Sequence, residues 1–293
     1  MYIFKNKKMT IINKIVAITI GSLFIVSCGG NNSENHDKSD SLDIHIKDTT
    51  ATTVEDSTKF KFDFTIANIP SPASYLHDFA VYGYNYDNSI LNSPKKIGSY
   101  SNDFYKSVNL GIYCIDMAYA MDNNNGQDVL LYMKNVMSIS DGLGLKNSII
   151  NMVGKRAETN LSNKDSLFQI LDEIFIKSDY YLRTNNRVYT ASNVFVGSWL
   201  ESFYLTCKII STIKDAEIKT KVYKQLWDQR FHLGNLIILL NDFKDKKDCA
   251  ELINDLKIIH EEIKAVKQPN EITDDKFKSI SNKIIELRNK VTK

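Results

Sequence analysis

The sequence is poor in histidine and carries none of the motifs that mark the commonest catalytic centres. Five of its 293 residues are His, and His36 and His45 lie in a polar segment where solvated side chains are expected. A GxSxG elbow, a Walker loop, a GxGxxG fingerprint and an HExxH pair are all absent. Cysteine and histidine are not spaced as zinc ligands either, so the sequence predicts no metal site and no cofactor.

Cysteine is also scarce. Apart from Cys28 near the amino terminus, the chain contains Cys114, Cys207 and Cys249, and an odd number cannot be fully paired within one chain. Cys114 and Cys207 lie in apolar stretches, where a free thiol packs like a small hydrophobic group. We therefore expect unpaired buried thiols, with a bridge between Cys114 and Cys207 as the alternative.

Apolar runs long enough to cross a membrane are missing as well. A transmembrane helix needs about 20 apolar residues, whereas the longest run beyond the amino-terminal segment extends only from Leu233 to Leu240. Residues 15–26 form an earlier, shorter run, preceded by four basic residues, Lys5, Lys7, Lys8 and Lys14. A basic stretch followed by a short apolar run is typical of a secretory signal peptide.

The end of this segment, Ile25-Val26-Ser27-Cys28, followed by Gly29, resembles the lipobox of bacterial lipoproteins. The resemblance implies that residues 1–27 are removed as a signal peptide and that Cys28 becomes the acylated, palmitate-bearing first residue. Two or more acyl chains anchor a protein stably to a bilayer, whereas a single chain binds only marginally. An ordinary signal peptide with an incidental cysteine is the alternative.

The residue after Cys28 bears on location. Gly29 stands where, by analogy with enteric lipoproteins, an Asp would favour retention in the inner membrane. The resemblance therefore favours a lipid-anchored protein of the bacterial cell envelope, in the outer membrane, and leaves its periplasmic or surface face open.

The charge balance argues against nucleic acid as a partner. Four of the 37 Lys and Arg residues lie in residues 1–27, and none of the 35 Asp and Glu residues do. The mature chain would therefore carry 33 basic against 35 acidic side chains, a net charge near −2, whereas nucleic-acid binders are usually strongly basic.

Residues 28–59 read as the lipidated cysteine and a disordered tether. They are rich in Asn, Ser, Asp and Thr, and such a composition buries too little apolar surface to fold. Acidic residues outnumber the three lysines there: Glu34, Asp37, Asp40, Asp43, Asp48, Glu55 and Asp56. A solvated spacer is the simpler interpretation, and an acidic export signal, as in some surface lipoproteins of Bacteroidota, is the alternative.

The start of the folded part shows a period of two residues. Phe60, Phe62, Phe64 and Ile66 alternate with polar residues, and such alternation predicts a short strand. An extended arm whose aromatic rings cover a groove on the helices is the alternative.

The remainder of residues 60–293 reads as a single all-α domain, a multi-helix bundle of about nine helices. Pro72, after Ser71, is typical of a first helical position, and Gly142 is typical of a helix end. The expected helices cover residues 71–84, 103–121, a segment ending at 142, 146–159, 163–185, 190–210 and 215–240, with two more in residues 241–293.

Residues 241–293 have the most regular pattern in the chain. Apolar residues are spaced by three or four in two runs, Leu252 to Val266 and Ile280 to Val291, separated by Pro269. This spacing predicts an antiparallel helical hairpin, which either packs on the body or offers an interaction surface.

Two short stretches are similar to uncharacterised helical lipoproteins of Bacteroidota. They are residues 109–113, Asn-Leu-Gly-Ile-Tyr, and residues 197–201, Gly-Ser-Trp-Leu-Glu. The resemblance implies a location in the envelope and no activity. The two predicted helices that contain these stretches share a glycine followed by an acid, Gly111 and Asp116 in one and Gly197 and Glu201 in the other. This is too little to indicate an internal duplication.

Two carboxylates within apolar helices are the strongest candidates for a site. Asp116 and Glu201 have apolar neighbours, and burying an unpaired carboxylate costs several kcal/mol. Each therefore needs a partner, for which the candidates are Arg156, Arg183 and Arg187. A structural salt bridge is the first interpretation. A ligand site of Asp116, Trp199, Glu201 and Arg187 is the second, and a catalytic carboxylate pair is the third.

Eight of the 15 tyrosines lie in residues 75–119. Tyrosine buries its ring while its hydroxyl stays polar, so these residues either pack helices together or line a ligand groove. They are Tyr75, Tyr82, Tyr84, Tyr86, Tyr100, Tyr105, Tyr113 and Tyr119.

Three functions follow as hypotheses. The first is a membrane-anchored envelope lipoprotein whose soluble helical domain binds a protein or a small ligand. The second is a structural component of an envelope assembly. The third is an envelope enzyme, which requires Asp116 and Glu201 to meet in an open cleft with shifted pKa values.

Overall fold

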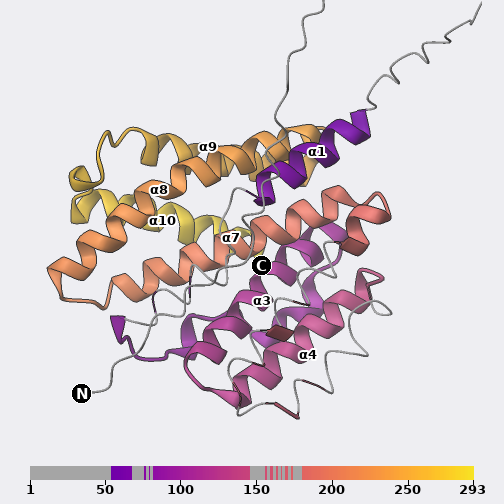
Figure 1. Ribbon diagram of the computed structural model, residues 1–293, viewed down its shortest axis with the longest axis horizontal. Helices are drawn as coiled ribbons and strands as arrows, with labels where there is room; N and C mark the ends of the chain where they lie inside the picture. Colours follow the sequence, from indigo (N-terminus) through magenta and orange to yellow (C-terminus); the bar gives the residue numbers. More distant parts are fainter. Residues whose placement is uncertain are drawn as a thin grey trace, which may run out of the picture. The chain divides into compact units, whose positions relative to one another are not determined.

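The computed structural model describes residues 54–67, 82–145 and 180–293, together with ten single positions between them. Those positions are Leu76, Phe79, Arg156, Thr159, Asn160, Asn163, Ser166, Gln169, Ile170 and Glu173. Every regular element of this described part is a helix (Figure 1), which confirms the all-α bundle. The helices expected at residues 71–84, 146–159 and 163–185 fall largely outside it.

Two helices form the centre of the described part. α3 (Asp103–Asp122) buries 17 of its 20 residues, and α7 (Val188–Ile210) buries 20 of its 23. Helices that are apolar on most sides must be enclosed by others, and α3 and α7 pack more extensively on each other than any other pair of described helices. Both match the sequence prediction closely.

Glycine allows α3 and α7 to touch through their backbones. A Cβ on Gly111 would overlap the carbonyl oxygen of Val194, and a Cβ on Gly197 would overlap the carbonyl oxygen of Val108. Ser198 Oγ also donates to the Gly111 carbonyl at 3.3 Å. The contact is reciprocal, so any larger side chain at either glycine would push the central helices apart.

The outer helices cover this pair. α4 (Gly126–Gly142) packs on α3, and α8 (Ala216–Leu240) packs on α7 and on α9. The predicted end of α4 at Gly142 is confirmed. Short 3-10 helices complete the described part: η2 (Asn88–Ile90), η3 (Pro94–Ser99), η4 (Asn241–Phe243) and η5 (Pro269–Glu271).

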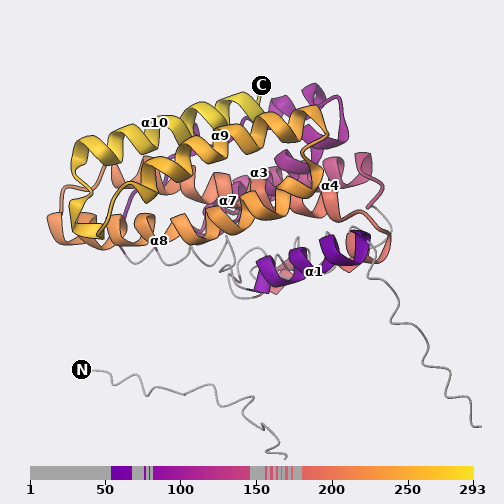
Figure 2. The same ribbon diagram turned by 90° about the horizontal axis from the view of Figure 1, so that it is seen from above.

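The carboxyl-terminal hairpin is present as predicted. α9 (Lys247–Lys264) and α10 (Asp274–Val291) run side by side along α7 and α8 (Figure 2), with η5 in the turn between them. Thr273 caps α10 by accepting a hydrogen bond from the Lys276 amide at 3.3 Å. Both hairpin helices bury one apolar stripe, so the hairpin belongs to the same bundle.

The prediction of a strand at residues 60–66 is wrong. α1 (Val54–Ala67) is a helix whose buried side carries Thr58, Phe62 and Thr65, at the spacing of successive helical turns. No strand exists among the described residues to pair with an extended segment, whereas a helix satisfies most of its own backbone hydrogen bonds. Because α1 begins at Val54, the predicted tether boundary at residue 59 also lies too late in the chain.

The three described cysteines, Cys114, Cys207 and Cys249, are free and buried. This confirms the expectation of unpaired thiols and contradicts a bridge between Cys114 and Cys207. Within the described part, no helix combines the length and apolar character that a membrane span requires.

Candidate functional site

The structure brings Asp116 and Glu201 together and adds a partner from the carboxyl-terminal hairpin. Asp116 lies on α3, Glu201 on α7, and Arg288 on α10. Arg288 Nε donates to Glu201 Oε2 at 3.0 Å, and Arg288 Nη2 donates to Glu201 Oε1 at 2.9 Å. This two-point geometry is the strong form of an Arg–carboxylate pair.

The surroundings of Asp116 shift the pKa of its carboxyl group. Burial and the adjacent charge of Glu201 raise the pKa of Asp116 well above its usual range, although Arg288 acts in the opposite direction. Asp116 Oδ2 accepts a hydrogen bond from the Asn92 amide at 3.2 Å. No described donor reaches Oδ1, and a side-chain hydrogen bond with Glu201 adds to the upward shift of the pKa. The surroundings of Asp116 therefore favour its neutral form.

Polar side chains enclose the cluster on the side of η2 and η3. Asn92 Nδ2 donates to Tyr100 Oη at 2.9 Å and to Asn109 Oδ1 at 3.2 Å, and Tyr132 Oη donates to the Asn92 carbonyl at 3.1 Å. The guanidinium of Arg288 lies 4.5 Å from the centre of the Tyr204 ring, close enough for a cation–π contact. The cluster is therefore part of a closed polar network inside the bundle.

None of the three arginines proposed from the sequence is the partner. Arg156 pairs with Glu173 at 2.8 Å, and Arg183 pairs with Asp63 at 2.7 Å. Arg187 donates to the Leu143 carbonyl at the end of α4, at 2.6 Å. The overlooked signal was the position of Arg288, which follows Ile280 and Ile284 at four-residue steps and so continues a buried stripe of α10.

The four-residue ligand site predicted from the sequence does not assemble. Trp199 Nε1 donates to Gln229 Oε1 on α8 at 2.9 Å, and its ring packs against Phe203, with the ring centroids 5.2 Å apart. Residues 199 and 201 are separated by about 200° around a helix, so Trp199 points away from Glu201. Of the predicted set, only Asp116 and Glu201 meet.

The arrangement gives these carboxylates a structural role. Asp116 and Glu201 are both fully buried, and Arg288 is 6% exposed. A catalytic pair requires an open cleft in which substrate can reach at least one carboxylate, and these two are closed by Arg288 and Asn92. The cluster instead joins α3, α7 and α10, so it fastens the hairpin to the central pair.

The described tyrosines mostly pack the segment before α3 onto the bundle. The Tyr119 ring stacks with those of Tyr84 and Tyr86, at centroid distances of 5.7 and 5.1 Å. Tyr86 Oη donates to Asp128 at 2.6 Å, and Tyr113 Oη donates to the Ser93 carbonyl at 2.8 Å. Burial raises the pKa of Tyr84 to about 12. These contacts support the packing interpretation over a ligand groove.

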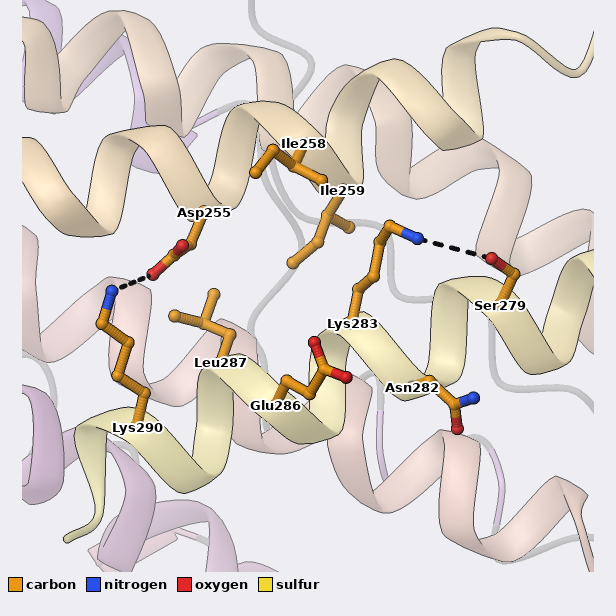
Figure 3. Close-up of a pocket in the computed structure, with 9 residues that line it drawn as sticks. All are labelled: Asp255, Ile258, Ile259, Ser279, Asn282, Lys283, Glu286, Leu287 and Lys290. Atoms are coloured by element: carbon orange, nitrogen blue, oxygen red, sulfur yellow. Dashed lines mark hydrogen bonds and ion pairs between the residues drawn. The ribbon is translucent and has the colours of Figure 1, made fainter.

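A surface groove lies between α9 and α10 (Figure 3). It has a volume of about 440 Å³, an apolar base at Ile259 and Leu287, and Ile258 at its edge with 55% of its surface exposed. An ion pair crosses it, between Lys290 and Asp255 at 2.7 Å. The remaining lining is polar: Ser279, Asn282, Lys283 and Glu286. The groove combines an apolar base with both signs of charge.

Other kinds of site lack support within the described residues. They contain no group of three or more His, Cys, Asp or Glu side chains arranged to hold a metal ion. The predicted lipidation site, Cys28, lies outside the described residues. No protein-family model, curated protein or solved structure matches this chain.

Proposed function

We propose that this chain is a lipoprotein of the bacterial cell envelope, with a helical body that serves as a binding or interaction domain. Residues 1–27 are the signal peptide in this proposal, and Cys28 carries the acyl chains that hold the body at the bilayer. The outer membrane is the favoured location. The observation that carries the proposal is the stretch Ile25-Val26-Ser27-Cys28, which ends the apolar run of residues 15–26 with a cysteine, because only cysteine supplies the thiol that is acylated.

The architecture of the body is consistent with binding rather than with catalysis by Asp116 and Glu201. Both carboxylates are enclosed, so the enzyme hypothesis loses the site on which it rested. The groove between α9 and α10 is open to solvent and lies on the hairpin that the sequence marks as a candidate interaction surface. The partner of this binding domain is either a protein or a small ligand. A structural component of an envelope assembly is the second hypothesis.

Acylation of Cys28 tests the proposal directly. The full chain and its Cys28→Ser variant would be expressed in a bacterium that matures lipoproteins, and the cells fed an alkyne analogue of palmitate. We expect the wild-type chain to take up the label, to gain the mass of its acyl chains and to sediment with membranes. The Cys28→Ser chain should do none of these.

A matched control is Cys249→Ser, which removes another thiol and leaves Cys28 in place. It should be labelled like the wild type. Loss of label in both variants, or label that persists in Cys28→Ser, would contradict the proposal. Density separation of the two membranes then tests the outer-membrane location, and protease treatment of intact cells distinguishes the surface face from the periplasmic face.

A further inference from the structure

Exposed apolar side chains gather on α1 and α8. Seven large hydrophobic residues are exposed in the described part of the chain, and four of them lie on these two adjoining helices. Phe60 and Phe64 on α1 are 71% and 57% exposed, and Phe231 and Ile238 on α8 are 61% and 58% exposed. We call these four side chains the apolar edge.

The orientation of α1 makes Phe60 and Phe64 point outward, whereas Phe62 is buried. Thr58 Oγ1 and Lys61 Nζ both donate to Asp242, directly after α8, each at 2.7 Å. These contacts hold one side of α1 against the bundle, and Phe60 and Phe64 lie one helical turn apart on another side. Phe231 and Ile238 are seven residues apart on α8, close to two helical turns, so these exposed side chains share one face of that helix.

The amino-terminal chain indicates what covers this edge. α1 is the first described helix, and Val54 follows the predicted acylated Cys28 by 26 residues. Even fully extended, that length spans at most about 90 Å. A tether of this reach keeps the body at a high effective concentration beside the bilayer, so even a weak apolar contact is populated.

We propose that the apolar edge of α1 and α8 rests in the interface of the bilayer that holds the acyl chains of Cys28. This inference rests on the proposed lipid anchor. Aromatic and aliphatic side chains on one side of a helix enter the boundary between headgroups and acyl chains. Because Asp56 and Asp63 are also exposed on α1, the contact is apolar rather than a basic patch on anionic lipid.

The contact would orient the whole body. α1 packs on α7 and α8, whereas α10 packs on α9, α7 and α3 and lies on the opposite side of α8 from α1 (Figure 2). With the apolar edge on the bilayer, the groove between α9 and α10 faces away from the lipid. It is then accessible to a partner in the aqueous phase.

Fluorescence quenching by brominated lipid tests the contact. The acylated full chain would be reconstituted in phosphatidylcholine and phosphatidylethanolamine vesicles, with tryptophan introduced as Phe60→Trp, Phe64→Trp or Ile258→Trp. Ile258 is the matched control, since it is exposed to a similar extent but lies on the hairpin. Emission from the parent chain, which contains Trp199 and Trp227, is subtracted.

We expect the tryptophans at positions 60 and 64 to lose about half of their emission, because residues of an interfacial helix reach the acyl region. The tryptophan at position 258 should lose no more than the parent, and added salt should leave the quenching unchanged. Equal quenching at all three positions, no quenching at 60 and 64, or quenching abolished by salt would overturn the inference.

Vesicle flotation and the mass of the acylated amino terminus separate this result from the proposed function. A chain that floats with acyl chains on Cys28, yet shows no quenching at positions 60 and 64, is a lipoprotein without this contact. A chain that carries no acyl group and does not float contradicts the anchor, and the inference with it.

Discussion

Arg288, near the end of the last helix, makes two hydrogen bonds to Glu201 in the middle of α7, 87 residues earlier in the chain. The pair closes the bundle, because it connects the carboxyl-terminal hairpin to a carboxylate that has no access to water. A buried charge without its partner is costly, so the pair makes the stability of the core depend on the position of the hairpin.

The first prediction concerns Arg288→Met. Removing the guanidinium leaves the carboxylate of Glu201 buried without its partner. The free energy of unfolding, measured in urea, should therefore fall by about 3–5 kcal/mol. The double variant Arg288→Met/Glu201→Met should recover much of that loss, because it removes both charges. Arg156→Met, which breaks an exposed pair, is the control and should change little. Equal stability of Arg288→Met and the wild type would show that the pair does not hold the hairpin.

The second prediction concerns the proton on Asp116. Burial and the charge of Glu201 raise the pKa of Asp116, so its surroundings favour the neutral form, which Asp116→Asn imitates in shape and charge. We therefore expect Asp116→Asn to cost far less stability than Glu201→Gln. The raised pKa of Asp116 stabilises the fold below the ordinary value near 4. This contribution is lost progressively as the pH rises towards the pKa of the folded state.

Denaturant unfolding of both chains across pH measures this effect. The stability of the wild type relative to Asp116→Asn should fall as the pH rises above about 4. A difference between the two chains that is independent of pH, or that grows in favour of the wild type, would mean that Asp116 is ionised in the folded protein.

The third prediction concerns the contact between α3 and α7. Gly111→Ala and Gly197→Ala each place a methyl group against the backbone of the other helix, which cannot shift as a side chain would. We expect the free energy of unfolding of each variant to fall by about 3 kcal/mol or more, which is the upper end of the usual cost of overpacking a core, or the variant to fail to fold. Gly98→Ala, where the added methyl meets open space, is the control. Thermal unfolding that is the same for all three would refute the close approach.

The fourth prediction concerns the thiols. Burial raises the pKa values of Cys114 and Cys207 to about 12 and that of Cys249 to about 11. At pH 8 roughly one in 10⁴ of the first two would be ionised, and the thiolate is the reactive form. In the Cys28→Ser chain, Ellman's reagent should therefore detect almost no thiol in the native protein and three in denaturant. Rapid reaction of Cys114 or Cys207 in the native chain would contradict their burial.

The sequence predicted helices correctly wherever the pattern of a segment's own residues was enough to identify the helix. The three- and four-residue steps from Leu252 to Val266 predicted α9, because a single buried stripe on a helix repeats at that spacing. α3, α7 and α8 were also located to within a few residues, the first two as long segments that are apolar on most sides. At residues 60–66 it failed, because the alternation of Phe60, Phe62 and Phe64 matches a strand, although no strand is available among the described residues to pair with it.

The candidate site was predicted in part. Asp116 and Glu201 were identified because carboxylates within apolar helices require a partner. Trp199 was placed beside Glu201 because the two residues are close in sequence. Side chains two positions apart on a helix, however, point in nearly opposite directions. Arg288 was missed because its distance in the chain hides a contact that only the docking of α10 creates.

The sequence alone determined that the body is helical and that its carboxyl-terminal residues form a hairpin. These properties depend on local periodicity and composition, which each segment carries by itself. The tertiary structure decided that Gly111 and Gly197 mark a backbone contact, that α1 presents Phe60 and Phe64 outward, and that Arg288 neutralises Glu201. Those properties depend on which helix faces meet, and the faces are chosen by packing the whole bundle at once.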